Sequence, residues 1–205
     1  MSRAMKMRTM SSIWSGMRRR VAALVVDCRG IAAVEFAVIA PLMLTMFFAT
    51  VEFSNGVAAD RKVTLVARTL SDLVSRSTTV TVTDFTNFFA AGTGVMYPYS
   101  ASLLNSTISQ LWINPATSQA RVQWSYGAEP RGAGTTVAVP SDLIAKDSTG
   151  KVVPNQYLIY SEVNYNYTPA VAWLLKGGIT LSDYTYTRPR QSTCVMYNTT
   201  VCTTL

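Results

Sequence analysis

Residues 31–51 read IAAVEFAVIAPLMLTMFFATV, and Glu35 is the one charged residue among them. A run of about 21 mostly apolar residues has the length of an α-helix that crosses the hydrocarbon core of a bilayer. An ionised carboxylate in hydrocarbon costs roughly 2.5–3.5 kcal/mol at mid-helix, so Glu35 requires an explanation. One interpretation is a tolerated charge, because Glu35 lies only about 6 Å past Ile31 and near the helix end. The stretch predicts a single membrane-spanning helix.

The residues that precede Glu35 favour a second interpretation. A basic leader is followed by Gly30, four small or apolar residues, Glu35 and Phe36, and then by the rest of the apolar run. This order resembles the processing site of type IV pilin-like proteins, and more closely that of the TadE-like minor pilins (pseudopilins) of tight-adherence, or Flp, pilus systems. The resemblance is carried by Asp27, Arg29, Gly30, Ala33, Glu35, Phe36, Ala37, Pro41, Leu42, Met43, Leu44, Glu52, Phe53 and Gly56, with a familiar tail at residues 186–190.

The resemblance implies that a membrane aspartic prepilin peptidase cuts between Gly30 and Ile31. It implies that Glu35, followed by Phe36, serves recognition and assembly by meeting the new α-amino group of a neighbouring Ile31 when helices bundle. The chain would be a minor pilin that initiates, caps or regulates a Tad pilus used for adherence, with no catalytic residues and no cofactor. Its partners would be other pilins, the peptidase and the inner-membrane assembly machinery.

The positive charge of the chain is concentrated before the apolar run. The net charge is +7, and residues 1–30 hold seven basic residues against one acidic residue, Asp27. The remaining 175 residues are close to neutral, so no basic face for nucleic acid is predicted. Basic residues near a span are retained on the cytoplasmic side. We therefore expect the N-terminus in the cytoplasm and the C-terminal domain in the periplasm, across the bacterial inner membrane.

The three cysteines agree with that topology. Cys28 would lie on the reducing side, whereas Cys194 and Cys202 would lie in the oxidising compartment. A bridge between Cys194 and Cys202 is predicted, and it would close a short loop worth roughly 2.5 kcal/mol. The chain has no histidine, which excludes histidine triads and histidine-based metal sites, and no metal is expected.

The fold class follows from a change of pattern after the span. Within residues 55–77 apolar residues recur every three or four positions, which predicts an amphipathic continuation of the 31–54 transmembrane helix to about residue 77. The stripe consists of Val63, Val66, Ala67, Leu70, Leu73 and Val74. Pro41 frees the carbonyl of Ala37 and predicts a kink, whether as an assembly hinge or merely as a tolerated bend. Residues 78–205 are rich in strand and turn residues, so we expect an α+β, pilin-like fold with the helix packed on an antiparallel sheet.

Elements within residues 78–205 are predicted from local signals. Asp84 predicts the N-cap of a short helix over 85–91 that Gly92 and Gly94 would stop. A hairpin is predicted from 103–113 and 120–126, and the best strand over 157–167. Weaker patterns favour a strand at 137–139, a brief helix at 141–145, a helical turn at 169–175 and a strand at 179–187.

Two other functional hypotheses stay open. A secreted or periplasmic binding module, released by ordinary signal peptidase, would use residues 36–51 as its apolar region and be cut after Ala59. Glu35 at the start of that region and a basic segment of about thirty residues before it argue against this hypothesis. An uncleaved, membrane-anchored enzyme would have only scattered carboxylates for its chemistry.

Overall fold

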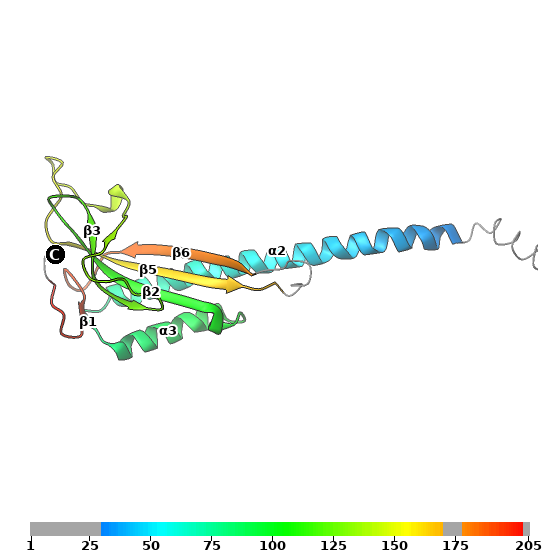
Figure 1. Ribbon diagram of the computed structural model, residues 1–205, viewed down its shortest axis with the longest axis horizontal. Helices are drawn as coiled ribbons and strands as arrows, with labels where there is room; N and C mark the ends of the chain where they lie inside the picture. Colours follow the sequence, from blue (N-terminus) through cyan, green and yellow to red (C-terminus); the bar gives the residue numbers. More distant parts are fainter. Residues whose placement is uncertain (1–29, 170–177, 203–205) are drawn as a thin grey trace, which may run out of the picture. The chain divides into compact units, whose positions relative to one another are not determined.

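The computed structural model describes residues 30–169 and 178–202 (Figure 1). The leader before residue 30, Cys28 and all but the start of the helical turn predicted at 169–175 lie outside the described residues. The chain divides into two compact units, Met1–Val51 and Glu52–Leu205. One helix supplies residues to both units.

The long helix predicted from the sequence is α2, Ile31–Ser75, which ends two residues before the predicted boundary. Only Pro41 interrupts its helix-forming sequence, and no glycine but Gly56 lies inside it. In the second unit α2 is amphipathic, as predicted. Its buried apolar side chains are Ala59, Val63, Val66, Ala67, Leu70 and Val74, while Leu73 is half-buried.

The second unit contains a five-stranded antiparallel sheet in the order β4-β3-β2-β5-β6 (Figure 1). The strands are β2 (Leu104–Ile113), β3 (Ala120–Gly127), β4 (Thr136–Val137), β5 (Gln156–Tyr167) and β6 (Ile179–Thr187). Thus the predicted hairpin and the strands predicted at 157–167 and 179–187 are confirmed. The central pair β2–β5 is in continuous register from Leu104 opposite Tyr165 to Ile113 opposite Gln156.

The two faces of the sheet belong to two hydrophobic clusters, because side chains alternate along each strand. One face, which includes Ile108, Ile159 and Val163, packs in a single cluster with the α2 stripe and with Phe85 of α3. The opposite face carries Leu111 and Leu158 in a second cluster. The α+β, pilin-like arrangement of a long helix on an antiparallel sheet is therefore confirmed.

The short helix predicted over 85–91 is wrong in both of its bounds. Helix α3 spans Val82–Met96, and its N-cap is Thr81, which forms a capping box with Asp84 at the third helical position. The helix continues through Gly92 because that glycine is buried against α2, where a β-carbon would lie 3.2 Å from Val66 Cγ1. Close packing between the helices, rather than a helix stop, explains this glycine.

Short elements complete the second unit. β1 (Thr79–Val80) pairs in parallel with β7 (Met196–Tyr197), a contact that no local pattern predicted. Turns of 3₁₀ helix occur at η2 (Ala101–Leu103) and η3 (Ser141–Leu143). The strand predicted at 137–139 is β4, one residue earlier, and the helix predicted at 141–145 is the shorter η3.

Candidate functional site

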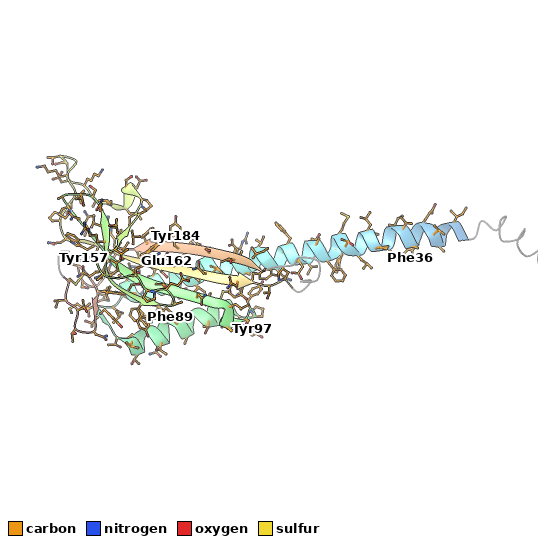
Figure 2. The ribbon with its side chains drawn as sticks, viewed as in Figure 1. Phe36, Phe89, Tyr97, Tyr157, Glu162 and Tyr184 are labelled. Atoms are coloured by element: carbon orange, nitrogen blue, oxygen red, sulfur yellow. A yellow bond between two sulfur atoms is a disulfide. The ribbon has the colours of Figure 1, made fainter. Side chains whose placement is uncertain are left out.

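The first unit presents an apolar helical surface that the second half of α2 lacks. From Ile31 to Val51 every described side chain is exposed except that of Ala40, which is half-buried. Figure 2 shows these side chains, Phe36 among them, projecting from the ribbon. Within the described residues α2 is the one helix long and apolar enough to cross a membrane. Length and composition thus make this surface suited to a lipid or protein environment rather than to water.

The predicted site residues of this unit lie within the first two turns of α2. Gly30 directly precedes the helix, and nothing lies within 4 Å of the place where a β-carbon would stand. Ile31 is the first helical residue, and Glu35 follows one turn later on the same side of the helix. Both Glu35 and Phe36 are exposed, and within the described part of the chain Glu35 has no ion-pair partner. A glycine directly before the helix and a carboxylate one turn inside it, without an ion-pair partner among the described residues, are therefore close together in the chain.

Pro41 lies ten residues into α2 without ending it. One turn later the hydroxyl of Thr45 donates a hydrogen bond to the carbonyl of Pro41 at 2.8 Å. Thr50 makes the same contact with the carbonyl of Met46 at 2.9 Å. Such back-bonding satisfies hydroxyl groups inside an apolar helix and is associated with bending. The kink at Pro41 stays a prediction.

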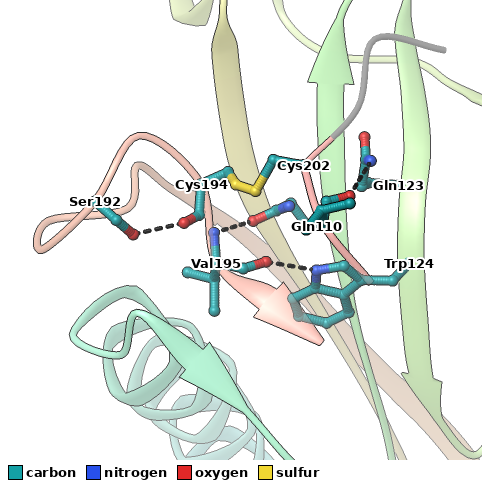
Figure 3. Close-up of a disulfide and its surroundings, with 8 residues drawn as sticks. Gln110, Gln123, Trp124, Ser192, Cys194, Val195 and Cys202 are labelled. Atoms are coloured by element: carbon teal, nitrogen blue, oxygen red, sulfur yellow. Dashed lines mark hydrogen bonds between the residues drawn. A yellow bond between two sulfur atoms is a disulfide. The ribbon is translucent and has the colours of Figure 1, made fainter. Parts of the chain in front are cut away.

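The predicted disulfide joins Cys194 to Cys202 in the second unit (Figure 3). The adjacent residue, Val195, is fixed to the sheet by two side chains. Its N–H donates to Gln110 Oε1 at 2.6 Å, and its carbonyl accepts from Trp124 Nε1 at 2.8 Å. The cross-link and these two bonds hold the C-terminal segment against strands β2 and β3. This arrangement stabilises the unit and offers no reactive thiol.

A polar cluster on β5 escaped the sequence analysis. Both terminal guanidinium nitrogens of Arg131 donate to the carboxylate of Glu162, one of them at 2.7 Å. Tyr160 Oη donates to Glu162 Oε1 at 2.9 Å. The bond to Glu162 raises the pKa of Arg131, whereas burial comes first among the causes that raise the pKa of Tyr160. Arg131 therefore stays protonated and Tyr160 stays neutral at neutral pH. A lone Glu162 in an aromatic strand was the signal that could have suggested a paired arginine.

The described residues offer little chemistry. Among them no group of three or more His, Cys, Asp or Glu side chains could hold a metal ion. An open cleft of about 310 Å³ lies between α3 and the β2–β3 pair, lined by Phe89, Thr93, Leu104, Ser106, Tyr126, Gly127 and Ala128. Its wall contains no carboxylate, thiol or basic side chain, so no lining group could act as the general base that would activate the hydroxyl of Thr93, Ser106 or Tyr126.

Comparison with known proteins identifies the N-terminal region. Residues 30–71 match the family model described as TadE-like protein. No curated protein and no solved structure matches the chain significantly. The family is not a known enzyme family and is associated with the Tad pilus system. The matched segment begins at Gly30, contains Glu35 and Pro41, and ends within the part of α2 that packs in the core of the second unit. Over this segment the chain is similar to the TadE-like family.

Proposed function

We propose that this chain is a minor pilin, or pseudopilin, that takes part in the assembly, initiation or capping of a Tad pilus used for adherence. A prepilin peptidase removes residues 1–30 by cutting between Gly30 and Ile31. The apolar half of α2 holds the chain in the inner membrane as a single span before assembly and contacts the helices of other pilins afterwards. The part from residue 78 onwards is the periplasmic domain.

One observation carries the proposal: an exposed apolar helix starts immediately after a glycine and, one turn later, bears a glutamate that has no ion-pair partner among the described residues. The exposed helix suits both lipid and a bundle of similar helices. The peptidase must accept an extended backbone beside the bond it cuts, and Gly30 can adopt one without a side chain in the way. The family match begins at this same residue.

Glu35 supplies a reason for the apolar half of α2 to leave lipid for a bundle. Cleavage after Gly30 would create an α-amino group on Ile31. A buried carboxylate that meets an ammonium group of a neighbouring molecule loses most of its desolvation cost, whereas the same carboxylate alone in hydrocarbon keeps it. The pairing therefore favours the assembled state over the single span. Phe36, next to it, adds exposed aromatic surface for helix contact.

The secreted-module hypothesis fits the second unit poorly. It requires a cut after Ala59, which is fully buried within α2. That cut would separate Glu52 and Asn55 from Tyr167 and Tyr99, to which they are hydrogen-bonded. The TadE-like match also continues across the position without interruption. A chain cut there would lose contacts of its own domain, so we favour the cut after Gly30.

Processing is tested by Gly30→Leu in cells that contain the prepilin peptidase. The variant should keep its leader and migrate about 3 kDa above the mature wild type, for about 30 residues. Gly94→Leu is the matched control, because a β-carbon at Gly94 also meets nothing within 4 Å. Equal migration of the Gly30 variant and the wild type, or an N-terminus other than Ile31 in the wild type, would refute the processing site.

Assembly is tested separately by Glu35→Ala and Glu35→Gln. Both variants should be cleaved like the wild type and insert at least as well, since a desolvated charge is gone. A smaller amount of each variant should be recovered together with other pilins, and cells with either variant should carry fewer pili. Asp60→Asn is the control, because it removes an exposed carboxylate from the same helix, outside the apolar half. Normal piliation by both Glu35 variants would leave Glu35 as a tolerated charge near the helix end.

A further inference from the structure

The second unit has a distinct end at which α2 enters it. There Tyr167 Oη donates to Glu52 Oε2 at 3.1 Å, and Tyr99 Oη donates to the carbonyl of Asn55 at 3.0 Å. A β-carbon on Gly56 would lie 3.9 Å from the ring of Tyr167. The end of β5 and the segment after α3 therefore contact the first turn of α2 in this unit, and Ile179 at the start of β6 lies opposite Tyr167. We call this end the base, defined by Phe53, Tyr97, Tyr99, Tyr167 and Ile179.

The base is aromatic inside and apolar outside. The ring of Tyr99 lies 6.3 Å from that of Tyr167 and 6.5 Å from that of Tyr165, both nearly edge to face. Outside this cluster Tyr97 is 78% exposed and Phe53 is 73% exposed, the two highest values among the large apolar side chains described in the second unit. Ile179, which opens β6 opposite Tyr167, is 53% exposed. Figure 2 shows Tyr97 just past the end of α3.

Few residues of the chain separate the apolar run from the base. Val51 ends that run, and Asn55 is already bonded to Tyr99 of the base. Four residues of helix rise about 6 Å. A bilayer about 40–45 Å thick has a hydrocarbon core of about 30 Å, so each of its two headgroup layers is about 5–8 Å thick. The rise from Val51 to Asn55 is therefore comparable to the thickness of one headgroup layer. Tyrosine is enriched at that depth because its ring is apolar and its hydroxyl is polar. Exposed Tyr97 and Phe53 match such an environment better than bulk water.

The charged groups near the base are also compatible with a lipid surface. The carboxylate of Glu52 accepts the hydroxyl of Tyr167, so part of its polar surface is turned into the unit. Lys62 Nζ donates to the carbonyl of Val95 at 2.9 Å, close to the end of α3 that precedes Tyr97. The ammonium group of Lys62 is thus bonded to the backbone two residues before Tyr97, and a cation at a membrane surface would favour anionic headgroups.

We propose that the base is a membrane-contact surface, whose exposed side chains Phe53, Tyr97 and Ile179 insert into the lipid headgroup layer around α2. The inference rests on the proposed membrane span of α2. The contact fixes the depth of the domain before assembly, and it has to be broken when the chain leaves the bilayer.

Depth measurement on the full chain in vesicles of phosphatidylethanolamine and phosphatidylglycerol tests the proposal. In a Cys28→Ser background, with the Cys194–Cys202 bridge intact, one nitroxide is attached through Tyr97→Cys, Val38→Cys or Thr117→Cys. Thr117 lies in the exposed turn between β2 and β3 and Val38 in the apolar half of α2. Accessibility to oxygen reports lipid, and accessibility to a water-soluble nickel chelate reports solvent. The label at 97 should be several-fold less accessible to nickel than that at 117, and less accessible to oxygen than that at 38.

The outcomes separate this inference from the function on which it rests. If the label at 38 is in lipid and the label at 97 is as exposed to nickel as that at 117, the base does not touch the membrane. If the label at 38 is itself in water, the proposed span fails. Shielding at 97 from both reagents that disappears on dilution with lipid would show contact with a second copy and would overturn the inference. Ile179→Cys replaces Tyr97→Cys if that variant loses its near-ultraviolet circular dichroism.

Discussion

Gly92 and Gly94 lie two residues apart in α3, and the structure gives them opposite surroundings. A β-carbon at Gly92 would stand 3.2 Å from Val66 Cγ1 and 3.5 Å from Leu70 Cδ2, both in the buried stripe of α2. A β-carbon at Gly94 would meet nothing within 4 Å. We predict that Gly92→Val destabilises the second unit, whereas Gly94→Val is close to neutral.

The magnitude follows from comparing the two variants. Each exchanges glycine for valine in a helix, which is worth a few tenths of a kcal/mol in favour of valine, so the propensity gain cancels in the comparison. The remaining difference in the free energy of unfolding is the steric cost at Gly92. There even a β-carbon requires Val66 to move, and valine adds two methyl groups to that β-carbon. Overpacking of this kind costs about 1–3 kcal/mol. For a unit of about 150 residues we expect Gly92→Val to melt about 2–10 °C below Gly94→Val.

Thermal unfolding of the full chain in detergent, followed by near-ultraviolet circular dichroism, measures the difference. A second change makes the steric explanation specific: Val66→Ala should cost less in the Gly92→Val background than in the wild type, because it removes the methyl group that clashes. Coupling between touching residues is about 0.5–3 kcal/mol. Equal melting of the two valine variants, or additive effects of Gly92→Val and Val66→Ala, would show that α3 does not approach α2 at Gly92.

Two further predictions concern the second unit. Reduction of the Cys194–Cys202 bridge should lower the free energy of unfolding by roughly 2.5 kcal/mol, because the closed loop is short; an unchanged Tm under reducing conditions would contradict this. Burial, aided by the bond to Glu52, raises the pKa of Tyr167 to about 12, above the value of about 10 in an unfolded chain. The neutral phenol therefore stabilises the fold fully below about pH 10, and this contribution is lost as the pH rises through the folded pKa. Tyr167→Phe should remove part of this alkaline loss, and identical pH profiles of denaturant unfolding for the variant and the wild type would count against the Glu52 contact.

Much of the fold could be predicted because long, strongly patterned segments determine their own structure. Residues 31–75 contain one proline and one glycine, and the buried stripe of α2 repeats every three or four positions. In β5 buried side chains alternate with more exposed ones from Ser161 to Tyr167, with Val163 on the face of the helices. Where the apolar side chains of a segment repeat with one period, burial of that face and local geometry favour the same structure.

The features that the sequence did not predict depend on contacts between residues far apart in the chain. Gly92 was interpreted as a helix stop from its local character, but Val66 and Leu70, more than twenty residues earlier, explain it. The parallel pairing of β1 with β7 joins two-residue strands that no periodicity can reveal. Likewise the pairing of Arg131 with Glu162 links a loop to a strand 31 residues later. Each of these contacts has a physical reason only once the chain is folded.

The two glutamates of α2 lie near opposite ends of its apolar run and differ in burial and in their polar contacts. Glu52 is half-buried and accepts a hydrogen bond from Tyr167 within its own unit. Glu35 is exposed on an apolar surface and, in the described part of the chain, has no ion-pair partner. A carboxylate in hydrocarbon is stable only when something else compensates its charge. Glu52 has a partner within the folded domain, whereas the one we propose for Glu35, the terminal amine of another Ile31, exists only after cleavage and assembly.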